Sequence, residues 1–432
     1  MPKTYRVYAQ SLGCPKNRVD TETLLGRLPF ATCLVEQPHE ADLVLINTCS
    51  FIAPAVEESV RAVLEAAEAI RDISPRPVLA VTGCLPGRYG EELRRELAEV
   101  DVWGLPDALD MLPARLAGAL CAEAAAPTGR LASTPPSYAY LKIAEGCDHA
   151  CRYCTIPSIR GPLVSRPAGE LVTEAARLVE AGASELIVVA QDVTAYGRDL
   201  GEKDALKKLL GNLVQVPGLR WLRLLYLYPS GLTDDLLQFL AGLGRPFLPY
   251  FDIPFQHVHP EILAAMARPK AAGAEEVVAR VRGYFPEAAI RSTMIVGLPG
   301  EKKEHFSAML EFVQRARLHH LGVFSYCPEE GTPAATMPGQ VRRDVKERRA
   351  AAIMAAQQEI SASILDACVG EEMEVLVDAP HGEWPGLHVG RVWFQAPEID
   401  GVTYISGPDV APGRLVTATV EEAKDYDLVA LA

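Results

Sequence analysis

The sequence lacks the features of an exported or membrane-spanning chain. Residues 1–10 contain no apolar segment of the kind found in a secretory signal. No apolar run elsewhere reaches the roughly 20 residues that cross a bilayer. Basic residues are also in deficit, since 42 Lys and Arg stand against 56 Asp and Glu for a net charge of −14. This balance disfavours general nucleic-acid affinity. We expect a cytoplasmic protein with no membrane partner and no dedicated nucleic-acid binding.

Cysteine, in contrast, is well represented. Ten cysteines occur in 432 residues that carry no visible export signal. In a reducing compartment, clustered thiols are more often metal ligands or catalytic groups than disulfides. A hydrophobic content of 49% and a charged content of 23% are typical of a globular protein. The length predicts two or three domains.

A tight cysteine triplet is the most informative motif. Cys147, Cys151 and Cys154 have C-x3-C-x2-C spacing. Three thiolates can hold three irons of a four-iron, four-sulfur cluster, and the fourth iron stays open to bind a small molecule. Zinc is the alternative, with His149 as a fourth ligand, but structural zinc usually takes paired C-x2-C units and no second pair follows.

Three further cysteines each follow an apolar, strand-like run in the first third of the chain. Short continuous runs of this kind are typical of buried parallel strands, and helical patterns separate them. In such sheets, ligands bind beyond the carboxyl ends of the strands. Cys14, Cys49 and Cys84 fall at that edge and predict a second, auxiliary iron–sulfur site. The predicted strands cover residues 4–10, 42–48 and 77–83, and the predicted helices cover residues 16–28, 55–71 and 88–100.

The four remaining cysteines have no comparable pattern. A single cysteine is most often a small buried hydrophobe or an ordinary surface residue. We expect no cluster role for them. They are Cys33, Cys121, Cys327 and Cys368.

The middle of the chain repeats the strand–helix alternation six times. Residues 124–137 are rich in proline and small residues and predict a linker. The six units that follow predict a partial barrel of the triosephosphate-isomerase kind, with the triplet in a loop after its first strand. The predicted strands cover residues 139–144, 185–191, 221–228, 250–253, 289–296 and 321–326. The predicted helices cover residues 168–181, 204–213, 233–242, 275–284, 303–317 and about 341–367.

Several strand ends in this region carry polar or glycine-rich groups. Gln191 closes the second predicted strand, and Arg291 lies on the fifth. Gly297 and Gly300 follow the fifth strand, where glycine lets a nucleotide approach the backbone closely. The same Gly-Leu-Pro-Gly sequence is also an ordinary turn. A site role and a structural role are equally open for His257.

The last part of the chain changes character from residue 370 onward. Short strand-like runs cover residues 373–377, 388–394, 402–405 and 415–420, and they predict a small antiparallel β-barrel. Residues 370–432 contain twelve acidic and three basic residues. Such a surface repels phosphate backbone and attracts a basic partner. The complete prediction is an α/β domain (1–123), a linker (124–137), a partial barrel (138–367) and a β-barrel (368–432).

Over essentially its whole length the chain resembles the methylthiotransferases of the radical S-adenosylmethionine superfamily. The triplet with an aromatic residue before its third cysteine, Tyr153, resembles the superfamily signature. Within the family, the match is closest to a bacterial branch that modifies the small-subunit ribosomal protein S-twelve. Residues 163–164 depart from the family, which often has an arginine there, and Tyr153 stands where phenylalanine is common. The motifs that carry the resemblance are 11–17 (SLGCPKN), 47–52 (NTCSFI), 141–147 (LKIAEGC), 190–192 (AQD) with 196–197 (YG), 223–226 (RLLY) and 396–401 (APEIDG).

This resemblance implies an open α/β domain, a partial radical barrel and a C-terminal TRAM β-barrel. It implies two four-iron, four-sulfur clusters, S-adenosylmethionine, and transfer of a methylthio group to the β-carbon of one aspartate in the ribosomal protein. The triplet would bind S-adenosylmethionine, and the auxiliary site would carry the sulfur. A donor such as flavodoxin or ferredoxin would supply the electron. Tyr153, Gln191, Arg291, Gly297 and Gly300 would line the cofactor pocket, and no acid–base residue is assigned.

Two alternatives remain open at this stage. A tRNA adenosine methylthiotransferase would have the same fold and clusters. That branch usually has Gln-Met-Asn-like residues after the first cysteine, where this chain has residues 15–17 (PKN), and the acidic barrel also argues against it. A non-catalytic iron–sulfur protein that binds the ribosome as a sensor needs no open iron, so two three-cysteine sets count against it.

Overall fold

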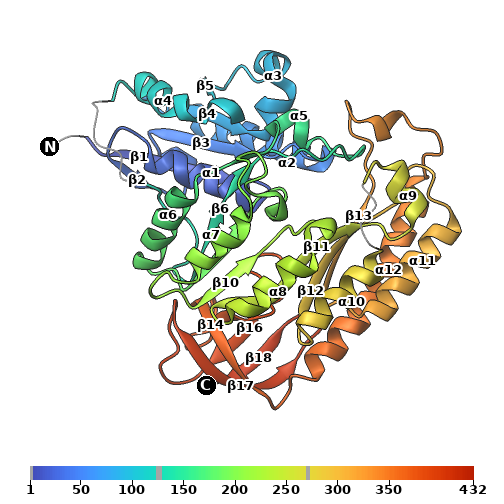
Figure 1. Cartoon of the computed structure of the whole chain (residues 1–432). Helices are drawn as coiled ribbons and strands as arrows, with labels where there is room; N and C mark the ends of the chain where they lie inside the picture. The colour runs from blue at the N-terminus through green and yellow to red at the C-terminus, as the bar shows by residue number, and fades with distance from the viewer. Residues whose placement is uncertain (1–2, 123–128, 269–272) are drawn as a thin grey trace. The chain divides into compact units, whose positions relative to one another are not determined.

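The computed structural model describes residues 3–122, 129–268 and 273–432 (Figure 1). It divides into two compact units, each described here by itself. The first unit comprises Met1–Ser133, Glu145–Asp148 and Cys154–Leu163. The second comprises Thr134–Ala144, His149–Tyr153 and Val164–Ala432. Part of the predicted linker, residues 124–128, lies outside the described residues.

A parallel sheet of five strands forms the core of the first unit, in the order β2-β1-β3-β4-β5. The predicted open α/β fold is confirmed, although β2 and β5 were not predicted. Both are too short, at three and two residues, to give a periodic signal. The strands are β1 (Tyr5–Ser11), β2 (Thr32–Leu34), β3 (Leu43–Thr48), β4 (Val78–Gly83) and β5 (Val102–Trp103).

Helices pack on this sheet because their apolar residues recur at helical spacing. In α2 the residues Ala62, Val63, Ala66 and Ile70 are all buried against the core. The described end of the linker is also tied to this unit, since Glu22 accepts hydrogen bonds from Ser133. The helices are α1 (Pro15–Gly26), α2 (Ala53–Ile70), α3 (Cys84–Glu96), α4 (Leu112–Leu120) and α5 (Ile156–Arg160), with short 3-10 helices at η1 (Pro38–Glu40) and η2 (Pro106–Met111).

The second unit is built on a parallel sheet of six strands in the order β13-β12-β11-β10-β9-β6. Neighbours in this order are also neighbours along the chain, apart from the two-residue strands β7 (Ala144–Glu145) and β8 (Val164–Ser165), which confirms the predicted succession of βα units. The strands are β6 (Tyr138–Lys142), β9 (Glu185–Val189), β10 (Trp221–Leu224), β11 (Phe247–Gln256), β12 (Ala289–Val296) and β13 (His320–Ser325).

Helices connect these strands and complete the units. No helix in the described part of the chain is long and apolar enough to span a bilayer. The helices are α6 (Ala168–Glu180), α7 (Ala205–Leu213), α8 (Asp234–Leu243), α9 (Pro260–Ala265), α10 (Ala274–Tyr284), α11 (Lys303–Ala316) and α12 (Arg343–Asp366), with 3-10 helices at η3 (Val193–Ala195), η4 (Pro229–Gly231) and η5 (Pro333–Thr336).

Strand β10 is shorter than the predicted run of residues 221–228. Tyr226 adopts a left-handed backbone, with φ of 60°, which a continuing strand does not allow. Its N–H donates at 2.9 Å to the side-chain carboxylate of Asp252 on the neighbouring strand β11, rather than to a backbone carbonyl oxygen. The apolar pattern therefore continues beyond the strand itself.

Five strands close the C-terminal barrel, in the order β14-β15-β16-β18-β17. Four of the pairings are antiparallel, as predicted, but β16 and β18 are parallel. The four-residue strand β18 was not predicted. The strands are β14 (Glu372–Pro380), β15 (His388–Val392), β16 (Thr403–Ser406), β17 (Leu415–Ala423) and β18 (Leu428–Leu431).

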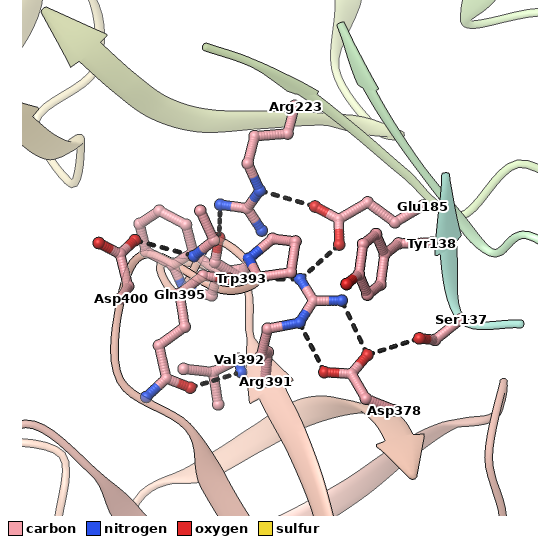
Figure 2. A network of polar contacts seen from close by, with 12 residues as sticks. Ser137, Tyr138, Glu185, Arg223, Asp378, Arg391, Val392, Trp393, Gln395 and Asp400 are labelled. Atoms are coloured by element: carbon pink, nitrogen blue, oxygen red, sulfur yellow. Dashed lines mark hydrogen bonds and ion pairs between the residues drawn. The ribbon is translucent and has the colours of Figure 1, made fainter. Parts of the chain in front are cut away.

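A buried charged network joins this barrel to the six-stranded sheet (Figure 2). Glu185, at the start of β9, accepts from Arg223 on β10 at 2.6 Å and from Arg391 on β15 at 2.5 Å. Arg391 also donates to Asp378 at 2.7 Å. Burial by itself would raise the pKa of Glu185, but the two guanidinium groups outweigh it and hold the pKa below its ordinary value. The barrel and the sheet are thus fixed to each other by paired charges.

Candidate metal centres

Three cysteines of the first unit lie at one edge of its sheet. Cys14 caps the amino end of α1, Cys49 follows β3, and Cys84 is the first residue of α3 after β4. Strands β1, β3 and β4 are neighbours in the sheet, so their carboxyl ends lie side by side. The structure therefore brings these three predicted ligands together. We call them the strand-end triad.

Glycines allow the loops of the strand-end triad to approach each other. Gly13 has φ of 85°, and a Cβ atom there would lie 2.6 Å from Cβ of Cys49 and 2.8 Å from its Sγ. Gly83 has φ of 95°, and a Cβ atom there would lie 2.4 Å from the carbonyl oxygen of Thr48. No other residue fits these two positions without displacing a ligand loop.

Buried hydrogen bonds fix the same loops. The side-chain amide of Asn17 donates to the carbonyl oxygens of Leu12 and Thr48, both at 2.9 Å. Ser59 accepts from the N–H of Cys49 at 3.0 Å and donates to its carbonyl oxygen at 2.7 Å. The backbone around Cys14 and Cys49 is therefore held by side chains from two helices.

The thiols of this triad suit a cluster better than a single ion. Two sulfurs on one zinc lie at most about 4.6 Å apart, because each Zn–S bond is about 2.3 Å long. Within the described residues, the only group of three potential ligands with all its atoms inside 4.8 Å is His259, Glu261 and His305. The thiols of the strand-end triad are therefore not all within 4.8 Å of one another, a spacing that a cluster with separate irons would accommodate.

Burial favours the protonated form of two of these thiols, those of Cys49 and Cys84. It raises the pKa of Cys49 to about 11. It also raises the pKa of Cys84, although the charge of Arg160 opposes that effect. Iron binding at this edge would therefore displace protons from the thiols.

Arg160 was not selected from the sequence. In the structure its side chain contacts one thiol of the strand-end triad. It ends α5, and its side chain is 3% exposed. Its Nε–H donates to Sγ of Cys84 at 3.3 Å. Its Nη1 donates to Asp20 at 2.8 Å and to Glu145 at 3.1 Å. Burial alone would lower the pKa of Arg160, but the neighbouring acidic groups raise it, so the guanidinium stays charged.

The cysteine triplet lies in the loop between β7 and α5. Cys147 and Cys154 belong to the first unit, and Cys151 belongs to the second. In the first unit, the N–H of Cys147 donates to the carbonyl oxygen of Gly161 at 3.1 Å. Gly146 has φ of 72°, and a Cβ atom there would lie 1.9 Å from the carbonyl oxygen of Pro162. The first ligand of the triplet thus follows a position that only glycine can occupy.

Two side chains of the second unit anchor the rest of the loop. His149 contacts Asp192 at 2.7 Å and stacks on Tyr228, with ring centroids 3.9 Å apart. Arg268 donates to the hydroxyl of Tyr153 at 2.9 Å and lies 3.9 Å from Sγ of Cys151. Asp192 follows β9, where polar strand ends were predicted. Arg268 was missed, because it lies after α9 and far from the triplet in sequence.

The predicted cofactor residues of the second unit divide into two groups. Gln191 follows β9, and Gly297 and Gly300 follow β12, so these three lie at the carboxyl ends of their strands. Gly297 has φ of 77°, and its N–H donates to Glu301 at 2.8 Å. A Cβ atom there would lie 2.3 Å from Cγ of Lys346, so close packing already requires glycine.

Arg291 and His257 occupy other surroundings. Arg291 is the third residue of β12, and its guanidinium lies 3.1 Å from Asp252 and 3.3 Å from Asp400 of the C-terminal barrel. The structure does not bring it together with the glycines that follow the strand. His257 is buried, with Nε2 3.5 Å from Glu301, and burial lowers its pKa. These contacts favour a structural role for His257.

Comparison with known families and proteins agrees with this architecture. Residues 141–313 match the radical SAM superfamily, residues 6–104 match the uncharacterized protein family UPF0004, and residues 369–432 match the TRAM domain. The chain is 57% identical, over 99% of both chains, to the ribosomal protein uS12 methylthiotransferase RimO of Oleidesulfovibrio alaskensis. It is equally similar to the protein of that name from Nitratidesulfovibrio vulgaris Hildenborough.

Solved structures show likeness in fold alone. The radical S-adenosylmethionine methyltransferase TsrM from Kitasatospora setae is 14% identical, with a TM-score of 0.55 over 90% of this chain and 81% of that one. The cobalamin-dependent S-adenosylmethionine radical enzyme OxsB is 11% identical, with a TM-score of 0.51 over 83% of this chain and 56% of that one.

Proposed function

The chain belongs to the RimO family of ribosomal protein uS12 methylthiotransferases, and we propose that it adds a methylthio group to the β-carbon of an aspartate in uS12. The observation that carries the proposal is the strand-end triad, since Cys14, Cys49 and Cys84 lie at one sheet edge in a chain that also has the triplet. A single cluster suffices to generate a radical. Sulfur insertion also needs a source of sulfur, which a second cluster with an open iron can provide.

Each cysteine set has a distinct role in this proposal. Cys147, Cys151 and Cys154 hold the four-iron cluster that binds S-adenosylmethionine, and the strand-end triad holds the auxiliary cluster. Together these groups supply radical formation and a transferable sulfur, which acid–base side chains cannot provide at an unactivated C–H bond. The chain itself orients the sites. Asn17 and Arg160 set the strand-end thiols, whereas His149 and Arg268 set the loop between the triplet cysteines.

The pocket for S-adenosylmethionine is proposed at the carboxyl ends of the six-stranded sheet. Gln191, Gly297 and Gly300 follow two of its strands, and Tyr153 precedes the third triplet cysteine. Arg291 is the weakest of the predicted contacts, because both of its neighbours in the structure are carboxylates that already pair with it.

Charge on the C-terminal barrel supports a protein acceptor over tRNA. Residues 370–432 contain twelve acidic and three basic residues. One of the basic residues, Arg391, is 1% exposed and paired with Glu185 and Asp378, so it contributes little to the outer surface. A ribosomal protein that binds RNA is basic and complements this surface, whereas tRNA would be repelled. We place the reaction in the cytoplasm, with flavodoxin or ferredoxin as electron donor.

The acceptor is the property to test. Reconstituted protein is incubated with S-adenosylmethionine, a reductant, and either uS12 or unmodified tRNA. Mass spectrometry then locates any methylthio gain. A gain on one aspartate of uS12 is expected. A gain on tRNA alone would contradict the proposal, and no gain on either with both clusters intact would favour a sensor.

A further inference from the structure

The contacts of Arg160 are unusual for a buried arginine, because one of them is to sulfur. Its Nε–H donates to Sγ of Cys84 at 3.3 Å, while its other nitrogens donate to oxygens of Asn17, Asp20 and Glu145. A salt bridge with Asp20 would not need that N–H. The fork of the guanidinium thus joins the cysteine ligand to the acidic groups around it.

Arg160 also lies next to the backbone that holds the triplet. It comes six residues after Cys154, and the following residue, Gly161, accepts a hydrogen bond from the N–H of Cys147. Glu145, its second carboxylate partner, comes two residues before Cys147. Within the first unit, a single side chain therefore connects the segments flanking the triplet to a ligand of the strand-end triad.

A charged donor beside a ligand sulfur has a definite effect on a cluster. Hydrogen bonds to the sulfurs and nearby positive charge stabilise the reduced form, because it carries one more negative charge, and so raise the reduction potential. The Arg160 side chain is 3% exposed and the Asp20 side chain 5%, so solvent screens this effect little. The direction of the effect follows from the hydrogen bond to the sulfur and from the positive charge that lies against it.

We propose that Arg160 is a positioning residue that holds Cys84 as a ligand of the auxiliary cluster and raises the reduction potential of that cluster. It acts through the sulfur and touches no substrate. Nothing comparable is proposed for the triplet, whose contact with this region is through the backbone of Gly161. The inference rests on the cluster role of Cys84 but is independent of the acceptor.

The test uses the full-length protein with both clusters reconstituted and no acceptor present. Electron paramagnetic resonance at a series of set potentials measures each cluster in wild type, Arg160→Lys and Arg160→Met. Because Arg160→Met also takes a cationic partner from the buried Asp20, the double variant Arg160→Met with Asp20→Asn removes one positive and one negative charge together. Arg115→Met is the control, since Arg115 is an arginine of the same unit that is exposed and donates to the carbonyl oxygen of Trp103.

The expected result is a shift of the auxiliary potential to a more negative value in the double variant, with the triplet cluster unchanged. Arg160→Lys keeps the charge and shifts less. Loss of auxiliary iron in Arg160→Met, with retention in Arg160→Lys and Arg115→Met, also supports the proposal. A wild-type auxiliary potential in the double variant, or the same shift in Arg115→Met, would overturn it. If wild type itself showed only one cluster, the proposed function would fail first.

Discussion

The two cysteine sets are built in opposite ways. The triplet comes from one loop of eight residues, whereas the strand-end triad comes from three strands that are distant in sequence and adjacent in the sheet. The loop depends on side chains that anchor it, namely His149 and Arg268. The strand-end triad depends on the fold itself. Gly13 and Gly83 let its loops approach each other closely, and Asn17 donates hydrogen bonds to two of these loops. A short sequence motif therefore suffices to predict the triplet, whereas the cysteines of the strand-end triad come together only when the sheet forms.

Removing one cysteine from each set gives the largest expected effect. Cys84→Ala should lose the auxiliary cluster and with it roughly half of the bound iron, and Cys151→Ala should lose the other half. Iron analysis and electron paramagnetic resonance distinguish the two losses. Cys368→Ala is the control, because Cys368 is a buried cysteine outside both sets, and its thiol donates to the carbonyl oxygen of Ile364. Loss of both clusters from either ligand variant would show that the sets are not independent.

Arg391→Met tests how much the buried charged network stabilises the second unit. This change leaves Glu185, which is fully buried, with one of its two arginine partners, and leaves Asp378 without its guanidinium partner, although it still accepts from Ser137. Breaking a buried ion pair costs about 3–5 kcal/mol, so the free energy of unfolding should fall by about 3 kcal/mol in denaturant titrations.

Arg245→Met provides the matched control for that substitution. Arg245 also pairs across to the barrel, with Glu374, but its side chain is 62% exposed. An exposed pair contributes less than about 1 kcal/mol. Equal losses in Arg245→Met and Arg391→Met would show that burial of the network does not matter.

Asn17→Ala tests the support of the strand-end triad. It removes hydrogen bonds to two buried carbonyl oxygens, those of Leu12 and Thr48, at a cost of about 2 kcal/mol. Because the same bonds hold the loops of Cys14 and Cys49, auxiliary iron should fall while triplet iron is kept. Iron content and denaturant unfolding are measured together. Asn212→Ala, on the exposed face of α7, should change neither quantity, and loss of triplet iron in Asn17→Ala would contradict the comparison.

Acid should weaken the second unit through His319. Burial lowers the pKa of His319 to about 4, and the charges of His320 and Arg282 add to this. The unfolded chain has a histidine pKa of about 6.5, so below that pH the unfolded state binds the extra proton. Stability is complete above about pH 6.5 and falls toward about pH 4, by at most about 3 kcal/mol.

Replacing the histidine separates its titration from general acid effects. His319→Gln should lessen the loss of unfolding free energy between about pH 7 and about pH 5 in protein prepared without iron. His39→Gln, at an exposed position of the first unit, should leave the wild-type pH dependence in place. The same slope in wild type and His319→Gln would rule out this histidine as the cause.

The sequence predicted those parts of the fold that rest on long apolar runs. Strands β1, β3 and β4 and their terminal cysteines were found because each strand follows a short apolar run in the sequence, although only β3 and β4 are almost fully buried. Strands β2 and β5 were missed because two or three residues carry no period, and β18 was missed and pairs in parallel where antiparallel pairing was expected. Charged residues inside apolar strands, such as Arg223 in β10, could be recognised in the sequence, but the sequence did not show which residue each one pairs with.

Residues that depend on tertiary contacts could not be predicted at all. Arg160 contacts side chains at positions 17, 20 and 84, and no spacing in the sequence connects them. Arg268 reaches Tyr153 and Cys151 in the same way. The ligands were therefore predictable from pattern, whereas the side chains that hold the ligands required the structure.

One paired measurement tests the division of labour between the two cysteine sets most directly. Wild type and Cys84→Ala are each incubated with S-adenosylmethionine, reductant and uS12. Both should cleave S-adenosylmethionine to 5′-deoxyadenosine, and only wild type should give methylthio-aspartate by mass spectrometry. Methylthio product from Cys84→Ala at the wild-type level, or no cleavage by that variant while its triplet cluster is intact, would contradict the account.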